Sequence, residues 1–311
     1  MRSRTRTVLG LIAACSLLAV CACGSAKNAP KKSLVPSPHF TGTATLSASP
    51  SAPPPPTTST NGPTTPRQHI VVVVMENHSY SDIIGSGHAP YLNALAARGA
   101  SLTQMFAITH PSQPNYVALF SGGTHGVTGD ACPQTVSGAN LATQISAAGL
   151  TFAGYSEGLP SIGSTVCTAG HYARRHVPWT NWPAVPGSVS HPFTDFPSSY
   201  DQLPTLSFVI PNLDDDMHDG TVAAGDAWLK AHLDAYAQWA ATHDSQLVVT
   251  WDEDDKSENN QIPTIIVGAG ITPQKVSARV TLYSLLRYLE DRLGLPRLGA
   301  AATAAPITLK G

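Results

Sequence analysis

Residues 70–77 read IVVVVMEN, and this stretch decides the fold. Its five consecutive β-branched residues, Ile70 to Val74, predict a strand that is buried on both faces, as in the middle of a parallel sheet. The apolar run stops at Met75, and Glu76 and Asn77 follow it. Open α/β sheets bind ligands at the carboxyl ends of their strands, so this carboxylate and amide are candidates for a binding site. On their own, they are more typical of a polar strand end that meets solvent.

Apolar runs and amphipathic segments alternate along the rest of the chain. Further strands are predicted at residues 150–155, 205–210, 246–251 and 263–268. Helices are predicted at residues 89–100, 115–121, 141–148, 225–243 and 281–293. Residues 157–191 are predicted to be mostly loop. Strands that alternate with helices imply an α/β fold, with a mostly parallel central sheet and helices on both faces.

The first 23 residues have the pattern of a bacterial lipoprotein signal peptide. Three arginines precede an apolar run at residues 8–20, which is too short to span a bilayer and indicates a secretory signal. The following residues resemble a lipoprotein cleavage box, with Cys23 as the predicted lipid-bearing residue and Cys21 as the alternative. An ordinary secretory signal is the other reading. In either case we expect an extracytoplasmic protein, lipid-anchored to the outer face of the cell membrane or secreted.

Residues 24–66 are rich in Pro, Ser and Thr. Such a composition cannot bury enough apolar surface to fold, so these residues are predicted to form a disordered tether. The folded domain is then residues 67–311. It holds two cysteines, Cys132 and Cys167, and an oxidising compartment favours a disulfide between them.

A second buried strand also ends in acidic residues, Asp252 to Asp255. The carboxyl ends of parallel strands lie at one edge of a sheet, so this cluster can meet Glu76 and Asn77. Several carboxylates in one cleft would raise each other's pKa, and a bound divalent cation removes that difficulty. Oxygen ligands favour Mg²⁺, Ca²⁺ or Mn²⁺ over zinc. The alternative is a solvated acidic turn.

Ser112 lies between two prolines in the segment THPSQPNY, residues 109–116. A serine hydroxyl becomes a good nucleophile when a base or a metal lowers its pKa. Placed against a cation, Ser112 could attack phosphorus, and Asn115 could donate a hydrogen bond to a phosphate oxygen. A serine before a proline turn is common, so this segment alone is weak evidence.

These segments, in their order, resemble the bacterial phosphoesterase family of the alkaline-phosphatase-like superfamily, and within it the secreted acid phosphatases of mycobacteria. The family includes acid phosphatases and phospholipases C. The likeness covers nearly all of residues 67–307 and is carried by residues 75–79, 109–116, 172–179, 214–220 and 251–255.

The resemblance implies a role for the matching residues. The implied ligands of one divalent cation are Glu76, Asn77, Ser112, Asp252 and Glu253. Ser112 is also the implied nucleophile, and His218 the implied proton donor to the leaving group. The expected substrate-binding residues are Asn115, Asp219 and His176, although structural roles are more typical of His176 and of His110.

Two positions depart from related enzymes. Leu282 stands where family members commonly have a histidine, and Asn212 where two-metal relatives use an aspartate. We therefore do not predict a second metal site.

The expected function is that of a metal-dependent acid phosphatase that hydrolyses phosphomonoesters through a phosphoserine intermediate. A phosphoinositide or a small phosphorylated metabolite is the expected substrate. The alternatives are a phosphodiesterase of the phospholipase C type and a non-catalytic lipoprotein that binds phosphate or metal. The net charge of −2, with no basic face, argues against a nucleic-acid partner. We expect a monomer that meets the membrane only through its lipid anchor.

Overall fold

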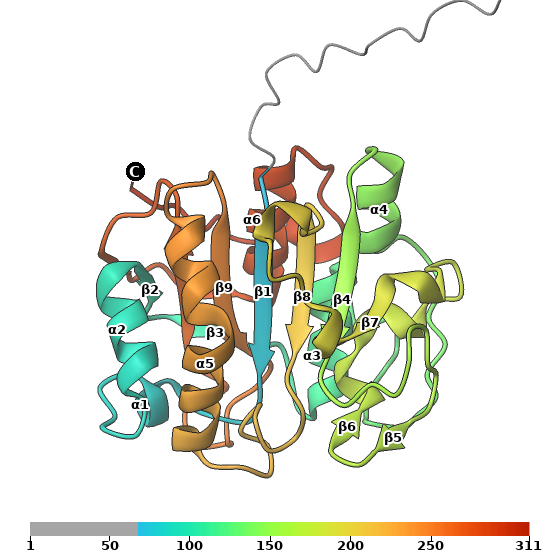
Figure 1. Ribbon diagram of the computed structural model, residues 1–311, viewed down its shortest axis with the longest axis horizontal. Coiled ribbons are helices and arrows are strands. Elements are labelled where there is room, and N and C mark those ends of the chain that lie inside the picture. The colour runs from blue at the N-terminus through green and yellow to red at the C-terminus, as the bar shows by residue number, and fades with distance from the viewer. Residues whose placement is uncertain (1–67, 311) are drawn as a thin grey trace, which may run out of the picture. The chain divides into compact units, whose positions relative to one another are not determined.

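The computed structural model of the protein describes residues 68–310. The predicted signal peptide, Cys23 and the tether lie outside the described residues (Figure 1), so those expectations stay predictions. In the described part of the chain, no helix is both long enough and apolar enough to cross a membrane.

An eight-stranded sheet forms the centre of the described chain (Figure 1). Its strands, in spatial order, are β11 (Gln274–Val276), β2 (Ala100–Leu102), β10 (Thr264–Gly268), β9 (Gln246–Trp251), β1 (Ile70–Met75), β8 (Leu206–Ile210), β4 (Phe152–Ser156) and β7 (Ser190–Pro192). β10 is antiparallel to both of its neighbours, and the other neighbouring strands are parallel. The predicted α/β fold with a mostly parallel sheet is confirmed.

β1 is the buried central strand that its sequence predicts. All six of its residues are buried, and it pairs in parallel with β8 on one side and β9 on the other. Met75 is in register with Trp251, the last residue of β9. Glu76 and Asp252 therefore leave the sheet side by side, and the backbone N–H of Asp252 donates to the carbonyl of Met75 at 3.0 Å.

Helices cover both faces of the sheet. In Figure 1, α2 (Pro90–Arg98) and α5 (Val222–Ala240) lie in front of it, and α3 (Ser112–Ser121) and α6 (Leu282–Leu293) lie behind it. α6 buries an apolar stripe that begins at Leu282. The remaining α-helices and strands of the described chain are α1 (Tyr80–Ile83), α4 (Leu141–Ala147), β3 (Met105–Phe106), β12 (Val280–Thr281), β5 (Thr168–Ala169) and β6 (Tyr172–Ala173).

α3 begins at Ser112, whereas the sequence predicted a helix from residue 115. Pro114 does not prevent the earlier start, because backbone N–H groups in the first turn of a helix need no intrahelical partner. Ser112 is thus the first helical residue, and regular backbone fixes the direction of its side chain.

The segment 157–191, predicted as mostly loop, also holds short regular elements. β5 and β6 form a small antiparallel pair, a 3₁₀ helix follows at Arg174–His176, and β7 begins at Ser190. Elements of two or three residues are too short to leave a periodic pattern in the sequence.

The predicted disulfide is confirmed. Cys132 and Cys167 are joined, with their Cα atoms 5.8 Å apart. The bond links the loop after α3 to the segment that leads into β5. Two residues before Cys132, the Asp130 carboxylate accepts a hydrogen bond at 2.9 Å from the backbone N–H of Gln113 in α3.

Gly154 in β4 is required by a close approach of Trp179, whose indole is buried against the strand. A Cβ at this position would lie 2.0 Å from Cζ2 of Trp179. We expect Gly154→Ala to lower the free energy of unfolding by about 2–3 kcal/mol, because the indole must move within a packed core. Urea denaturation measures this. Gly87→Ala is the control, since a Cβ there meets nothing within 4 Å; equal effects of the two changes would contradict the prediction.

Glu290 in α6 is buried, and burial raises its pKa to about 7. Between its ordinary pKa and about pH 7, the folded protein holds a proton that the unfolded chain releases. The stabilising contribution of protonated Glu290 is therefore present at pH 4 and is lost as the pH rises through this range.

We expect Glu290→Gln to be more stable than the unmodified protein at pH 8 by about 1–3 kcal/mol, and nearly equal to it at pH 4–5. Glutamine keeps an oxygen for the backbone N–H of Leu298, which donates to Glu290 at 2.7 Å. Denaturant unfolding at both pH values measures the difference. A stability difference that does not depend on pH would exclude titration of Glu290 as its cause.

Candidate active site

Polar residues from three distant segments meet at the carboxyl edge of the sheet. We call Glu76, Asn77, Ser112, Asp252 and Glu253 the oxygen cluster. Glu76 and Asn77 follow β1, Asp252 and Glu253 follow β9, and Ser112 begins α3. The parallel register of β1 and β9 brings the first two pairs together. These are the five residues predicted from the sequence as metal ligands.

Ser112 lies between the carboxylates of Glu76 and Glu253. Its Oγ is 3.1 Å from Oε2 of Glu76 and 3.3 Å from Oε1 of Glu253, so the hydroxyl can donate to either carboxylate. The residue is only 2% exposed. The hydroxyl predicted as a nucleophile therefore sits against carboxylates that could take its proton or share a cation with it.

Two oxygen atoms of the oxygen cluster are buried without a hydrogen-bond partner among the described residues. They are Oδ1 of Asn77 and Oδ2 of Asp252. Asn77 also adopts a left-handed backbone conformation with φ of 52°, which is uncommon outside glycine. Buried acceptors usually find a donor, so these oxygens indicate a ligand that takes lone pairs, as a hard cation does.

The carboxylates of the oxygen cluster disfavour one another's charge. Burial, and then the charges of Asp252 and Asp216, hold the pKa of Glu76 well above its usual range. Burial and the charge of Glu253 do the same to the pKa of Asp252. Burial also raises the pKa of Glu253 to about 7, against the opposing hydrogen bond from Ser112. A divalent cation would remove this repulsion, so the donor set fits one.

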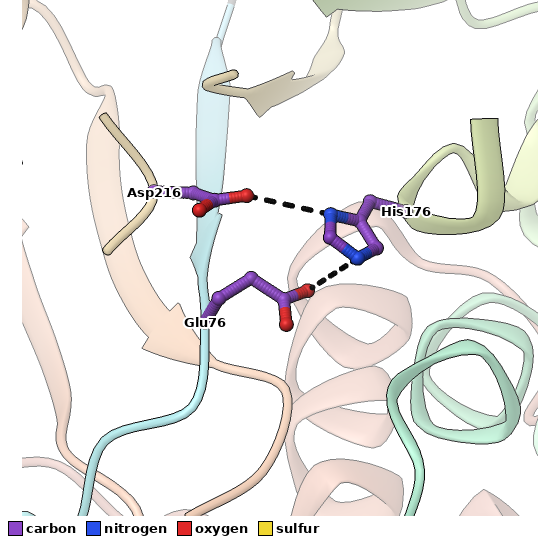
Figure 2. Close-up of side chains that lie close together, drawn as sticks. All are labelled: Glu76, His176 and Asp216. Atoms are coloured by element: carbon purple, nitrogen blue, oxygen red, sulfur yellow. Dashed lines mark ion pairs between the residues drawn. The ribbon is translucent and has the colours of Figure 1, made fainter. Parts of the chain in front are cut away.

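His176 joins Glu76 to a further buried carboxylate, Asp216. Figure 2 shows the imidazole between the two acids, with Nε2 3.2 Å from Oε1 of Glu76 and Nδ1 3.3 Å from Oδ2 of Asp216. One ligand atom from each residue lies within 4.8 Å of the others, so this Glu76–His176–Asp216 triad could also hold a metal ion. In the geometry present, each carboxylate faces a different ring nitrogen, so the histidine bridges the acids.

The surroundings of His176 disfavour its protonated form. Its pKa is held well below the usual range by burial, and then by the charges of Arg175 and His218. Tyr116 stacks on the imidazole, with ring centroids 5.2 Å apart, and donates its hydroxyl to Oε1 of Glu76. His176 is only 1% exposed and contacts Glu76 in this structure. Its direct contact with substrate stays a prediction.

His218 and Asp219 form a second, partly exposed group near the triad. Nδ1 of His218 is 2.6 Å from Oδ1 of Asp219, and Nε2 is 3.2 Å from a guanidinium nitrogen of Arg175. Guanidinium groups only donate, so Nε2 accepts and the ring proton lies on Nδ1, facing Asp219. The His218 ring centroid is 5.9 Å from that of His176.

Asn115 connects the turn before Ser112 to Glu253 of the oxygen cluster. Its buried Oδ1 accepts from the backbone N–H groups of Ile108 and Thr109, both at 3.0 Å. Its Nδ2 donates to the carbonyl of Thr109 at 2.8 Å and to Oε2 of Glu253 at 3.3 Å. The amide thus fixes the turn before Ser112, and the predicted contact with phosphate would have to compete with these bonds.

Three further residues of the site have no predicted catalytic, substrate-binding or metal-binding role, and one of them, His110, has only a predicted structural role. His110 bridges Glu253 (2.9 Å) and Asp254 (3.0 Å), Tyr116 donates to Glu76, and Asp216 faces His176. Asp216 belongs to the acidic segment 214–220 that the family resemblance already marked, so a signal for it existed. His110 and Tyr116 flank Ser112, but nothing in the sequence shows which way they point.

The two departures from related enzymes are structural positions here. Leu282 is 1% exposed and starts the apolar stripe of α6. Asn212 shapes the loop after β8: its Oδ1 accepts from the backbone N–H groups of Asp214 (2.9 Å) and Asp215 (3.2 Å).

Comparisons with known proteins show the family of this chain. A model of the phosphoesterase family matches residues 86–296. The chain is 54% identical over 241 residues to the phosphatidylinositol-3-phosphatase of Mycobacterium tuberculosis, covering 76% of this chain and 80% of that protein. It is 30% identical over 228 residues to the phosphate-repressible acid phosphatase of Penicillium chrysogenum, covering 67% of this chain but only 55% of that relative.

The fold is also similar to solved structures. A protein in the alkaline phosphatase superfamily from Vibrio parahaemolyticus matches with a TM-score of 0.54 and 15% identity, over 78% of this chain and 71% of that one. The phosphonate monoester hydrolase of Silicibacter pomeroyi matches with a TM-score of 0.52 and 12% identity, over 78% of each chain. The predicted alkaline-phosphatase-like fold is confirmed.

Proposed function

Because this chain belongs to the phosphoesterase family and is a phosphoric ester hydrolase, we propose that it is a metal-dependent acid phosphatase acting on phosphomonoesters. The observation that carries the proposal is the position of Ser112. Its hydroxyl lies 3.1 Å from Glu76 and 3.3 Å from Glu253, although these residues come from separate segments of the chain. A solvated acidic turn would not enclose a buried serine in this way.

Glu76, Asn77, Asp252 and Glu253, with the hydroxyl of Ser112, would hold one divalent cation. Because their donor atoms are all oxygens, Mg²⁺, Ca²⁺ or Mn²⁺ is the proposed metal. When bound, the cation withdraws charge from the phosphoryl oxygens and lowers the pKa of the serine hydroxyl.

The residues of the chain then divide the reaction into two steps. Ser112 Oγ forms a bond to phosphorus while its proton passes to Glu76 or Glu253. The ester P–O bond breaks, and the leaving oxygen takes a proton from His218, which has gained it from solvent on Nε2. In the second step, water attacks the phosphoserine, His218 takes a proton from that water, and Ser112 recovers its own. Free alcohol and inorganic phosphate are the products.

The name of one relative supports the proposed substrate class. A protein 54% identical to this chain is named as a phosphatidylinositol-3-phosphatase, so we propose a phosphoinositide or a small phosphorylated metabolite as the substrate. We further propose that residues 67–311 act outside the cytoplasm, anchored through a lipid on Cys23 or secreted.

A substrate panel with and without a chelator tests the proposal. We expect phosphate release from p-nitrophenyl phosphate and from phosphatidylinositol 3-phosphate. This activity should be lost in EDTA and restored by Mg²⁺, Ca²⁺ or Mn²⁺. Assayed from about pH 4 to pH 9, it should be highest on the acidic side of neutrality. Faster release of phosphocholine from phosphatidylcholine would favour a phospholipase C. Phosphate binding without turnover would instead favour a non-catalytic lipoprotein.

A further inference from the structure

Two neighbouring arginines on the 3₁₀ helix Arg174–His176 have different surroundings. Arg174 is buried, and its guanidinium donates to the side chain and carbonyl of Thr180, at 3.1 and 2.9 Å, and to the carbonyl of Thr165 at 2.8 Å. All three of its nitrogens are thus used by the protein. Arg174 is a structural residue.

Arg175 is half-buried and has almost no partner. Within residues 68–310, its hydrogen bonding is limited to Nε2 of His218 at 3.2 Å, and no carboxylate oxygen lies within 4.0 Å of its guanidinium. A guanidinium carries five N–H donors, and this contact uses one of them. A weak neutral acceptor is a poor partner for a full positive charge, so the group is available for an anion.

Two histidines connect Arg175 to the oxygen cluster. Arg175 contacts His218, the His218 ring lies 5.9 Å from the ring of His176, and His176 lies 3.2 Å from Glu76. Its charge also reaches the buried triad, where it lowers the pKa of both His176 and Asp216. Arg175 therefore supplies positive charge on the His218 side of an otherwise acidic site.

We propose that Arg175 binds the non-bridging oxygens of the substrate's phosphoryl group and thereby makes the site prefer phosphomonoesters to phosphodiesters. This inference rests on the proposed function. A monoester offers three non-bridging oxygens and up to two negative charges, so two oxygens can accept a bidentate pair from the guanidinium while the third faces the cation site. A diester offers two such oxygens and one charge. On moving to the phosphate, Arg175 leaves Nε2 of His218 free to carry a proton.

Arg175→Ala and Arg175→Lys test the proposal with p-nitrophenyl phosphate and bis(p-nitrophenyl) phosphate. We expect Arg175→Ala to lower kcat/KM for the monoester about 100-fold or more, and that for the diester less than about 10-fold. Lysine keeps the positive charge but lacks the paired N–H donors of a guanidinium. The kcat/KM of Arg175→Lys for the monoester should therefore lie between those of Arg175→Ala and the unmodified protein. Arg98→Ala is the matched control: it removes an exposed arginine paired with Asp234 and should leave both rates unchanged.

A binding measurement separates this proposal from the proposed function. Calorimetric titration of each metal-loaded protein with inorganic phosphate should show a Kd at least about 10-fold higher for Arg175→Ala, with an unchanged circular dichroism spectrum. Equal losses on both esters together with unchanged phosphate affinity would overturn the role of Arg175. If the unmodified protein hydrolyses neither ester, the proposed function fails, while the phosphate titration still decides whether Arg175 binds the anion.

Discussion

Ser112→Ala is expected to abolish phosphate release from p-nitrophenyl phosphate, lowering kcat by about four orders of magnitude or more. The hydroxyl lies within 3.3 Å of both Glu76 and Glu253, and among the described residues no other hydroxyl is hydrogen-bonded to both. Alanine leaves Glu76, Asn77, Asp252 and Glu253 in place, so the variant should still bind the metal. Activity assays and metal-dependent thermal shifts measure the two properties separately.

Ser121→Ala is the matched control for that change. Ser121 is buried at the other end of the same helix, and its hydroxyl donates to the carbonyl of Val117 at 2.7 Å. This variant should retain activity. Full activity in Ser112→Ala would rule out the phosphoserine, and loss of activity in both variants would point to damage to α3.

Asp252→Asn is expected to separate activity from stability. The pKa of Asp252 is held well above its usual range, first by burial and then by Glu253, so in the absence of metal a neutral amide is the better fit. In EDTA near pH 8 we expect the variant to unfold at a temperature higher by about 2–4 °C. With metal, the unmodified protein should gain about 2.7 kcal/mol at 100 times the Kd, and the variant much less. Its activity should fall at least about 1,000-fold.

Asp255→Asn provides the control within the same acidic run. Asp255 is exposed and accepts hydrogen bonds from Ser79 and Ser257, and these bonds lower its pKa. Removing its charge should leave metal-induced stabilisation in place. If Asp252→Asn keeps the full thermal shift on metal addition, the oxygen cluster is not the metal site.

Much of the architecture could be predicted because burial leaves a strong trace in the sequence. The run of five β-branched residues at β1 and the leucine stripe of α6 report continuous burial, and both elements lie where predicted. Residues at strand ends could be predicted too, because a polar side chain that follows a buried strand must emerge at the sheet edge. This reasoning identifies Glu76 and Asp252 from the sequence alone.

The other half of the site could not be predicted in this way. Asp216 and His218 lie on an irregular segment and Arg175 on a single 3₁₀ turn, and neither leaves a hydrophobic period in the sequence. The sequence also gave no indication that Arg174 would be enclosed by Thr180 while Arg175 faces His218. The antiparallel direction of β10 could not be predicted either, because the sequence of a buried apolar strand is the same whether its neighbours are parallel or antiparallel to it.

The disulfide has a practical consequence for producing the protein. Asp130, close to Cys132, accepts from the residue next to Ser112, and the carbonyl of Cys167 accepts from the backbone of Arg174 at 3.0 Å. The crosslink therefore connects the loop that contacts Gln113, next to Ser112, with the segment that carries Arg175. Recombinant material made in a reducing cytosol would lack this crosslink and should be exported or refolded under oxidising conditions before any kinetic constant is measured.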